Sequence, residues 1–541
     1  MHTITVILIM LLAVTVSGLL ARATRLPLPL VQIALGFALV QFTGDSVPLD
    51  PHVFFLLFLP PLLFLDGWRI PKDELFRDRG MVLELALGLV IFTVLGVGLF
   101  IHWLIPAMPY AVAFALAAIL SPTDPIAVSA IAQRAPIPKR MMHILEGESL
   151  LNDASGLVCM KFAVAAALTG VFSLGEATLD FLWVALGGLG IGIAVTWIVA
   201  RIKGFIMRRF GEDAGSSILI SVLIPFASFL AAEHFHASGI LAAVAAGISM
   251  TFFESGTLMA ATRVQRRAFW DTVQFILNGT IFVLLGEQLP ALLDRSIQTV
   301  ADTGHSNPWW LLVYVLVINA ALALLRFTWV WVSMRISVYH ARKRGEPRPP
   351  TDWRAVAAMS LAGVRGALTL AGVLTLPLAL NDGTPFPARD LSIFLAAGVI
   401  LMSLLAASFA LPRLLRGLKL PEDEHAHDEG PARAAAATAA IHAIEEKLHA
   451  LAHDRTDAAL YADVAARVME EYRRHLTHSI SGQHDARNAK RTGEIERKLR
   501  LAGLEAERGA YRQLRREDVI DDTVLQRLDH ELDLAAARLT V

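Results

Sequence analysis

Ser121-Pro122-Thr123-Asp124-Pro125 interrupts an otherwise apolar run over residues 108–133. A proline disfavours helical dihedrals in the residue before it, and here two prolines flank an acid. The spacing predicts that a helix through this run unwinds at Asp124. Unwinding frees backbone carbonyls and exposes the dipole ends of two half-helices, which together can hold a cation. The alternative interpretation is a proline-kinked helix in which Asp124 serves only as a cap.

The run lies in a chain of 541 residues whose two parts differ in composition. Residues 1–420 contain only 55 charged residues, whereas residues 421–541 contain 24 acidic and 18 basic residues. About a quarter of the residues in a soluble domain are charged. The composition therefore predicts a membrane domain over residues 1–420 and a helical cytoplasmic tail, regulatory in role, over residues 421–541. The net charge of −1 gives no sign of a nucleic-acid partner.

Thirteen apolar runs are each long enough to cross a membrane as a helix. Of the 30 Lys and Arg residues in this part, 25 follow odd-numbered runs, which predicts an extracellular N-terminus and a cytoplasmic tail. Runs 1–6 and 8–13 then cross in opposite senses, as in a 6+6 inverted repeat. The expected fold is all-α, and the runs are 3–21, 26–43, 51–68, 81–104, 108–133, 141–169, 178–200, 214–232, 237–253, 268–291, 309–334, 355–380 and 391–412.

The fifth run of the second half, 355–380, also contains a helix-breaking stretch, Gly363-Val364-Arg365-Gly366. A charge in hydrocarbon is costly, and Arg365 cannot lose its proton, so we expect a buried acid to neutralise it. Glu148 and Asp124 are the candidates. Lys161 either snorkels or pairs with an acid, and Arg326 is expected to be structural.

The densest group of buried acids is the sequence EGESLLND at residues 146–153. Helical spacing places Ser149 and Asp153 on one face, and Glu148 and Asn152 on the adjoining face. A hydroxyl and a carboxylate one turn apart form a hard-oxygen site that suits a proton or a small hard cation. Glu146 lies nearer the cytoplasmic end and is expected to be solvated.

Signatures of enzymes are absent from the sequence, which has no His-Glu-x-x-His, no Walker phosphate loop and no Gly-x-Ser-x-Gly nucleophile elbow. Cys159 is the single cysteine, so neither an intramolecular disulfide nor a cysteine metal cluster can form. We therefore expect a protein that is not an enzyme and has no cofactor.

The motifs at 121–125, 146–153 and 363–367 together resemble those of the cation/proton antiporter 1 family, the sodium/proton exchangers, in their bacterial form. The resemblance covers residues 1–415. It implies thirteen spans with crossed, broken helices, a dimerisation part built on spans 1–3 and 8–10, and a core part built on spans 4–6 and 11–13.

The resemblance also implies roles for individual residues. Asp153 matches the family's ion- and proton-binding acid, and Asn152 matches the residue before it. Family members carry an acid after a Pro-Pro pair in span 3, where Leu65 takes the aligned position and Asp66 follows, so Asp66 lies either at the site or at the cytoplasmic rim. The remaining matches are Thr123, Asp124 and Ser149, which help to coordinate the ion or hold the crossing, and Glu148 with Arg365, which form a core ion pair.

The expected function is electroneutral exchange of Na⁺, and also Li⁺, for H⁺ across the bacterial inner membrane, serving pH homeostasis. Asp153 holds either a proton or a cation while a core domain rocks against a dimer domain. The expected partners are these ions, membrane lipid and a second copy in a homodimer. Two alternatives are a K⁺/H⁺ antiporter and a membrane sensor with a vestigial transport site.

Overall fold

The structure is a computed structural model, and it describes most of the chain. The described residues are 2–43, 51–69, 80, 83–124, 128, 139–169, 174–254, 260–302, 307, 309–344, 352–416, 429–452, 462–470, 472–473, 483–517, 519, 524–525, 528, 531–533 and 535–536. The chain forms two units, Met1–Leu420 and Pro421–Val541.

Helices account for all the regular structure of the described residues in the first unit, apart from one isolated bridge between Ala379 and Pro385. The elements are α1 (His2–Thr24), α2 (Leu28–Thr43), α3 (Pro51–Arg69), the π-helix η1 (Glu84–Leu89), α6 (Val90–Leu104), α7 (Tyr110–Leu120), α9 (Lys139–Thr169), α10 (Leu174–Phe210), α11 (Ala214–His234), α12 (Gly239–Glu254), α13 (Ala260–Asp302), α14 (Trp309–Arg344), α15 (Trp353–Leu361), α16 (Ala367–Leu374) and α17 (Arg389–Leu415).

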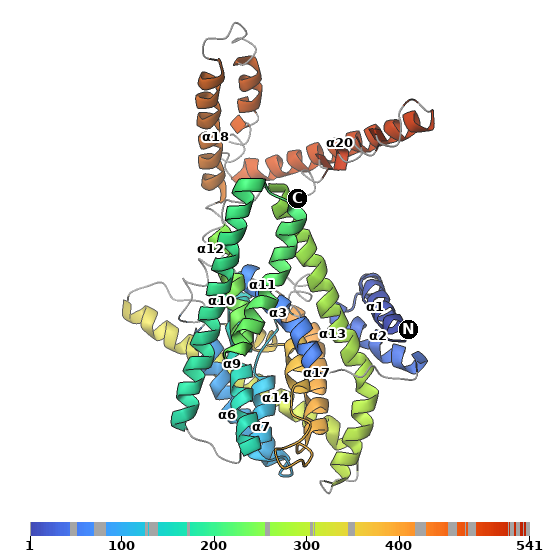
Figure 1. The fold of residues 1–541 in the computed structure, drawn as a ribbon, viewed down its shortest axis with the longest axis vertical. Helices are drawn as coiled ribbons and strands as arrows, with labels where there is room; N and C mark the ends of the chain where they lie inside the picture. The colour runs from blue at the N-terminus through green and yellow to red at the C-terminus, as the bar shows by residue number, and fades with distance from the viewer. Residues whose placement is uncertain are drawn as a thin grey trace. The chain divides into compact units, whose positions relative to one another are not determined.

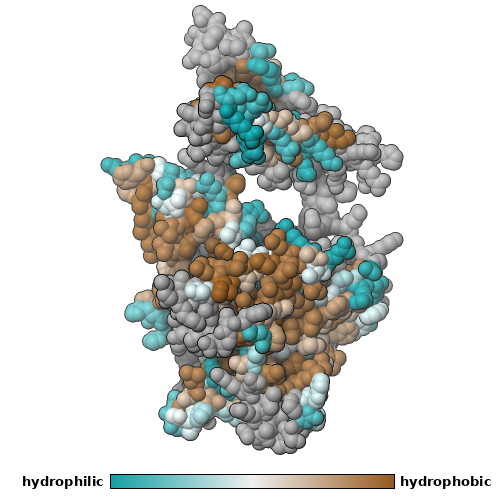
Figure 2. Space-filling model, turned by 90° about the vertical axis from the view of Figure 1, so that its right-hand side faces the viewer, coloured by the Kyte–Doolittle hydropathy of each residue, from teal (hydrophilic) through white to brown (hydrophobic). Residues whose placement is uncertain are grey.

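Eight of the described helices are long and apolar enough to cross a membrane, and three shorter apolar helices accompany them. Large hydrophobic side chains such as Leu12 and Leu19 on α1 are exposed. Figure 2 shows a broad field of hydrophobic residues on the face of the molecule turned to the viewer. A surface of this kind fits contact with lipid and not with water.

The helices of the first unit pack in two groups. In one group α12 packs against α3, α10 and α11, and α13 packs against α1 and α2, beside which it runs in Figure 1. In the other, α7 packs against α6 and α9, and α17 packs against α14, α15 and α16. The first group contains the helices of runs 1–3 and 7–10, and the second those of runs 4–6 and 11–13, with α13 and α17 in contact across the two groups.

Close helix contacts in the first group depend on glycine. A Cβ atom at Gly36 on α2 would lie 1.9 Å from the Val283 carbonyl oxygen, and one at Gly286 on α13 would lie 2.0 Å from the Ile33 carbonyl oxygen. Small residues let helix backbones approach in lipid, where no hydrophobic force drives helices together.

A side-chain cap marks the start of α11. The Asp213 carboxylate accepts a hydrogen bond of 2.7 Å from the Ser216 backbone N–H. Hydrogen bonds from Ser216 hold the pKa of Asp213 below its usual value. The cap satisfies a backbone donor that has no partner within the helix.

The second unit contains α18 (Glu429–Ala452) and α20 (Gln483–Arg516). Arg508 on α20 forms an ion pair with Asp533. Ala465, Met469 and Leu532 are buried within this unit.

Candidate functional site

Two helix interruptions meet in the core group. α7 ends at Leu120 and residues 121–124 are not helical, which confirms the predicted end of the helix before Asp124. α15 ends at Leu361 and α16 begins at Ala367, so the helix of run 12 is also broken. The Asp124 backbone N–H donates a hydrogen bond of 2.7 Å to the Val364 carbonyl, which joins the two interruptions directly.

Asp124 lies against the start of α16. Gly366 is the N-cap of α16, and a Cβ atom there would lie 1.7 Å from Asp124 Oδ2. Only glycine leaves room for the half-buried carboxylate at this point. A carboxylate at a helix N-terminus is stabilised by the positive end of the helix dipole, so Asp124 offsets the dipole of α16.

Arg365 compensates the opposite dipole end. The Nε atom of this buried side chain donates to the carbonyl of Leu120, the last residue of α7, at 2.9 Å. Its Nη1 atom donates to the Gly363 carbonyl at 2.5 Å. Carbonyls at a helix C-terminus have no partner within the helix, so a guanidinium there satisfies them and balances the negative dipole end.

The buried ion pair of the core joins Glu148 to Arg326. Arg326 Nη1 lies 2.5 Å from Glu148 Oε1, Nη2 lies 2.7 Å from Oε2, and the side chains are 3% and 1% exposed. The prediction that Glu148 pairs with Arg365 is therefore wrong. Arg326 on α14 reaches Glu148 because it packs over Gly363, where it also donates to the Met359 carbonyl at 3.1 Å, whereas Arg365 turns towards the end of α7.

A polar network extends from this pair into the interruption of α7. The Thr123 hydroxyl donates to Glu148 Oε1 at 3.2 Å and accepts from Asn152 Nδ2 at 3.1 Å. Asn152 Nδ2 also lies 3.4 Å from Glu148 Oε1, which confirms that residues 148 and 152 share a face. The network fixes the unwound segment to α9.

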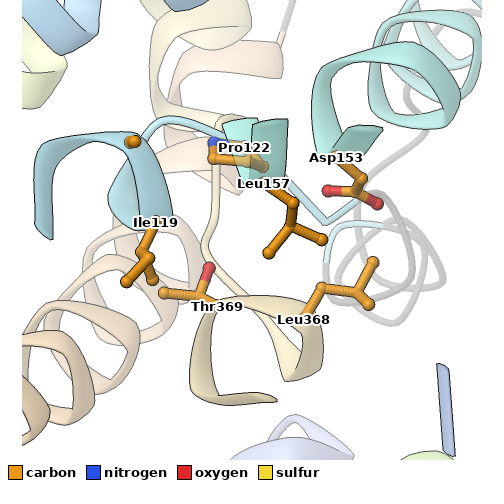
Figure 3. Close-up of a pocket in the computed structure, with 7 residues that line it drawn as sticks. Ile119, Pro122, Asp153, Leu157, Leu368 and Thr369 are labelled. Atoms are coloured by element: carbon orange, nitrogen blue, oxygen red, sulfur yellow. The ribbon is translucent and has the colours of Figure 1, made fainter. Parts of the chain in front are cut away.

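Asp153 lies next to this network and is 4% exposed. It lines a small pocket together with residues of α7, α9 and α16, and Figure 3 shows these side chains converging. Gly156 lets α9 approach, since a Cβ atom there would lie 2.5 Å from Pro122. Ser149, one turn before Asp153, is also buried. A carboxylate in such surroundings binds a proton or a cation to avoid an isolated buried charge.

Three other predicted residues have different surroundings. Asp66 lies on α3 and is partly buried, and α3 packs against both α9 and α16. Lys161 pairs with Glu233 of α11 at 3.5 Å, and the two side chains are 49% and 43% exposed. Glu146 is partly buried on the first part of α9. The ion-binding roles of Asp66, Asp124, Thr123, Ser149 and Asp153 stay predictions.

Sequence reasoning missed two residues of the site. Arg326 was expected only to be structural, and no local pattern connects it to Glu148, because the two lie 178 residues apart. Thr369 was not predicted at all, although it lines the pocket beside Asp153. Its signal was weak, one of two threonines in the apolar stretch after Gly366.

Comparisons with known proteins place the chain in a family. Residues 7–417 match the transmembrane sodium/hydrogen exchanger family. An uncharacterized Na⁺/H⁺ exchanger of Escherichia coli (strain K12) is 43% identical over 98% of both chains. A sodium, potassium, lithium and rubidium/H⁺ antiporter of Bacillus subtilis (strain 168) is 40% identical over 98% of this chain and 78% of its own.

The chain therefore belongs to the sodium/hydrogen exchanger family, a family of transporters, and the predicted family is confirmed. Its fold resembles the sodium proton antiporter MjNhaP1 from Methanocaldococcus jannaschii, with a TM-score of 0.59 and 18% identity over 77% of this chain and 99% of the other.

Proposed function

We propose that this protein exchanges a monovalent cation for H⁺ across a bacterial inner membrane by alternating access, with Asp153 as the shared site. The observation that carries the proposal is the buried Asp153 carboxylate in a pocket beside two joined helix interruptions. Charged groups and freed backbone at membrane depth mark ion pathways in transporters.

Coupling follows from competition at one carboxylate. Asp153 holds either a proton or a cation, so loading one releases the other. Asn152 cannot titrate, and Glu148 is bound by both terminal guanidinium nitrogens of Arg326. With Asn152 in the place of a second titrating carboxylate beside Asp153, one cation moves against one proton, and transport is electroneutral.

The proposed movement uses the two packing groups of the first unit. We propose thirteen spans in a 6+6 inverted repeat, with the α7, α9 and α14–α17 group rocking as the core. The α1–α3 and α11–α13 group forms the dimer contact, with the N-terminus outside. Supporting this division, α12 packs mainly against α3, α10 and α11, and α7 against α6 and α9. The tail is proposed to regulate exchange.

For the transported cation, the proposal has two candidates. Na⁺ is the first choice, and K⁺ is favoured as a further substrate because the Bacillus subtilis relative carries sodium, potassium, lithium and rubidium in its name. The experiment that separates them compares the rates of H⁺ exchange for Li⁺, Na⁺, K⁺ and Rb⁺ in the same preparation.

The test uses purified protein in liposomes that contain a pH-sensitive dye. An imposed cation gradient should drive H⁺ movement with the wild type, and Asp153→Asn should abolish it, because an amide carries no exchangeable proton. Asp382→Asn, an exposed acid in the loop before α17, is the matched control and should keep the wild-type rate. Clear cation-driven proton flux from the Asp153→Asn protein would refute the shared site, and a wild type without exchange would favour a sensor.

A further inference from the structure

The pocket beside Asp153 contains a second polar side chain, Thr369 of α16. Thr369 lies three residues after the N-cap Gly366 and is 3% exposed. Within the described part of the chain, its hydroxyl has no hydrogen-bond partner. Figure 3 shows the Thr369 oxygen directed into the space between α7 and α9. A hydroxyl that faces a pocket without a protein partner is available to a ligand that enters the pocket.

The other residues that line the pocket are apolar. Asp153 and Thr369 are its two polar side chains, and the rest are Ala118, Ile119, Pro122, Leu157 and Leu368. A cation that leaves water for this pocket must replace its water ligands with protein oxygens. Thr369 lines the same pocket as the carboxylate and can supply one of them.

The pocket lies on one side of the crossing. Ala118 and Ile119 precede the interruption of α7, Leu157 follows Asp153 by one turn, and α16 follows its own interruption. Beyond the pocket, α9 and α16 stay in contact, since Thr375 Oγ1 donates to Met160 Sδ at 3.8 Å. In the orientation expected from the basic loops, this is the extracellular side.

Two apolar side chains of the pocket also approach α16 beyond Thr369, at Gly372. A Cβ atom at Gly372 would lie 3.3 Å from Leu157 Cδ2 and 3.5 Å from Ile119 Cγ2. In this orientation, a cation passing between Asp153 and the extracellular side meets the hydroxyl of Thr369 in the same pocket.

We propose that Thr369 is a specificity-determining residue for the transported cation, supplying a hydroxyl oxygen on the extracellular wall of the Asp153 pocket. The inference rests on the proposed antiport function and deepens it. The positive end of α16 opposes a cation at this position, and the Asp124 carboxylate on Gly366 offsets that effect. A hydroxyl oxygen favours smaller cations, because the attraction rises as the ion approaches more closely.

Thr369→Val tests the proposal, since it removes the hydroxyl and keeps the branched shape. We expect the KM for Na⁺ and Li⁺ exchange to rise about five- to tenfold, the effect of losing one neutral polar contact, and the KM for K⁺ to rise less. The preference for Na⁺ over K⁺ should fall. Thr369→Ser keeps the hydroxyl and should restore the wild-type preference to within about twofold.

Thr375→Val is the matched control at the other end of the same helix, because the Thr375 hydroxyl is already bound to the Gly372 carbonyl at 2.6 Å. It should leave the cation preference unchanged. Cation-dependent thermal shifts of the purified variants give a second readout that does not need transport. If Thr369→Val does not fold, Thr369→Ala takes its place with the same expected result.

Two results would overturn the role of Thr369 while leaving antiport intact. The first is an active wild type whose cation preference is unchanged in Thr369→Val. The second is an equal loss for all cations that Thr369→Ser does not restore, which indicates packing alone. Absence of exchange in the wild type would instead refute the proposed function together with this inference.

Discussion

Among the described residues, the helix α9 takes part in one buried and one exposed ion pair. In its first half, Glu148 binds Arg326 through two oxygens, and both side chains are almost fully buried. In its second half, Lys161 lies 3.5 Å from Glu233, and both side chains are close to half exposed. The first pair belongs to the core group and the second joins α9 to α11 of the other group.

The difference shows that burial, more than charge, sets what an ion pair does. Removing one partner of a buried pair leaves a charge without water, whereas an exposed charge is simply solvated again. We therefore expect Glu148–Arg326 to hold the core together and Lys161–Glu233 to act as a weak contact that movement can break.

The largest predicted effect is on the buried pair. Glu148→Gln or Arg326→Gln should each lower the free energy of unfolding by about 3–5 kcal/mol, because each strands one buried charge. The double variant should recover part of that loss. Thermal unfolding of all four proteins in detergent gives the coupling free energy. Additive losses of unfolding free energy in the double variant would mean that the two residues do not act as a pair. The control is Glu146→Gln, which removes another acid from the same helix.

An intermediate effect is predicted at the crossing. Gly366→Ala would place a Cβ atom 1.7 Å from Asp124 Oδ2, so the carboxylate or the backbone must shift. Overpacking of this kind costs about 1–3 kcal/mol, and exchange should fall more than tenfold because Asp124 no longer meets the start of α16. Thermal stability and transport rate are measured together. Gly190→Ala, where nothing lies within 4 Å, should behave as the wild type.

The smallest effect is predicted for the exposed pair. Lys161→Gln should change the free energy of unfolding by about 1 kcal/mol or less, and the difference should shrink as ionic strength rises. The exchange rate should change modestly, since the pair links the two groups that are proposed to move. Unfolding and transport at low and high salt provide the measurement. A loss as large as that of Glu148→Gln would show that exposure is a poor guide to these pairs.

Local chemistry in the sequence accounts for much of the candidate site. Prolines at 122 and 125 predicted that the helix ends before Asp124, because the dihedral restriction acts on the neighbouring residue alone. One-turn spacing predicted that Glu148 and Asn152 meet, since helix geometry places them together whatever the fold around them. Hydrophobic runs and the three motifs were likewise enough to identify the family, because each motif is a short local pattern of residues.

Tertiary structure alone decided which groups meet across the chain. Arg326 and Arg365 are both buried and permanently charged, so the sequence offered no reason to pair Glu148 with Arg326 and not with Arg365. The choice depends on α14 passing over Gly363 and on the ends of α7 and α15, whose free carbonyls bind Arg365. Thr369 reaches the Asp153 pocket for the same reason. Contacts between distant segments depend on where helices cross. The spacing of residues along the chain does not predict these crossings.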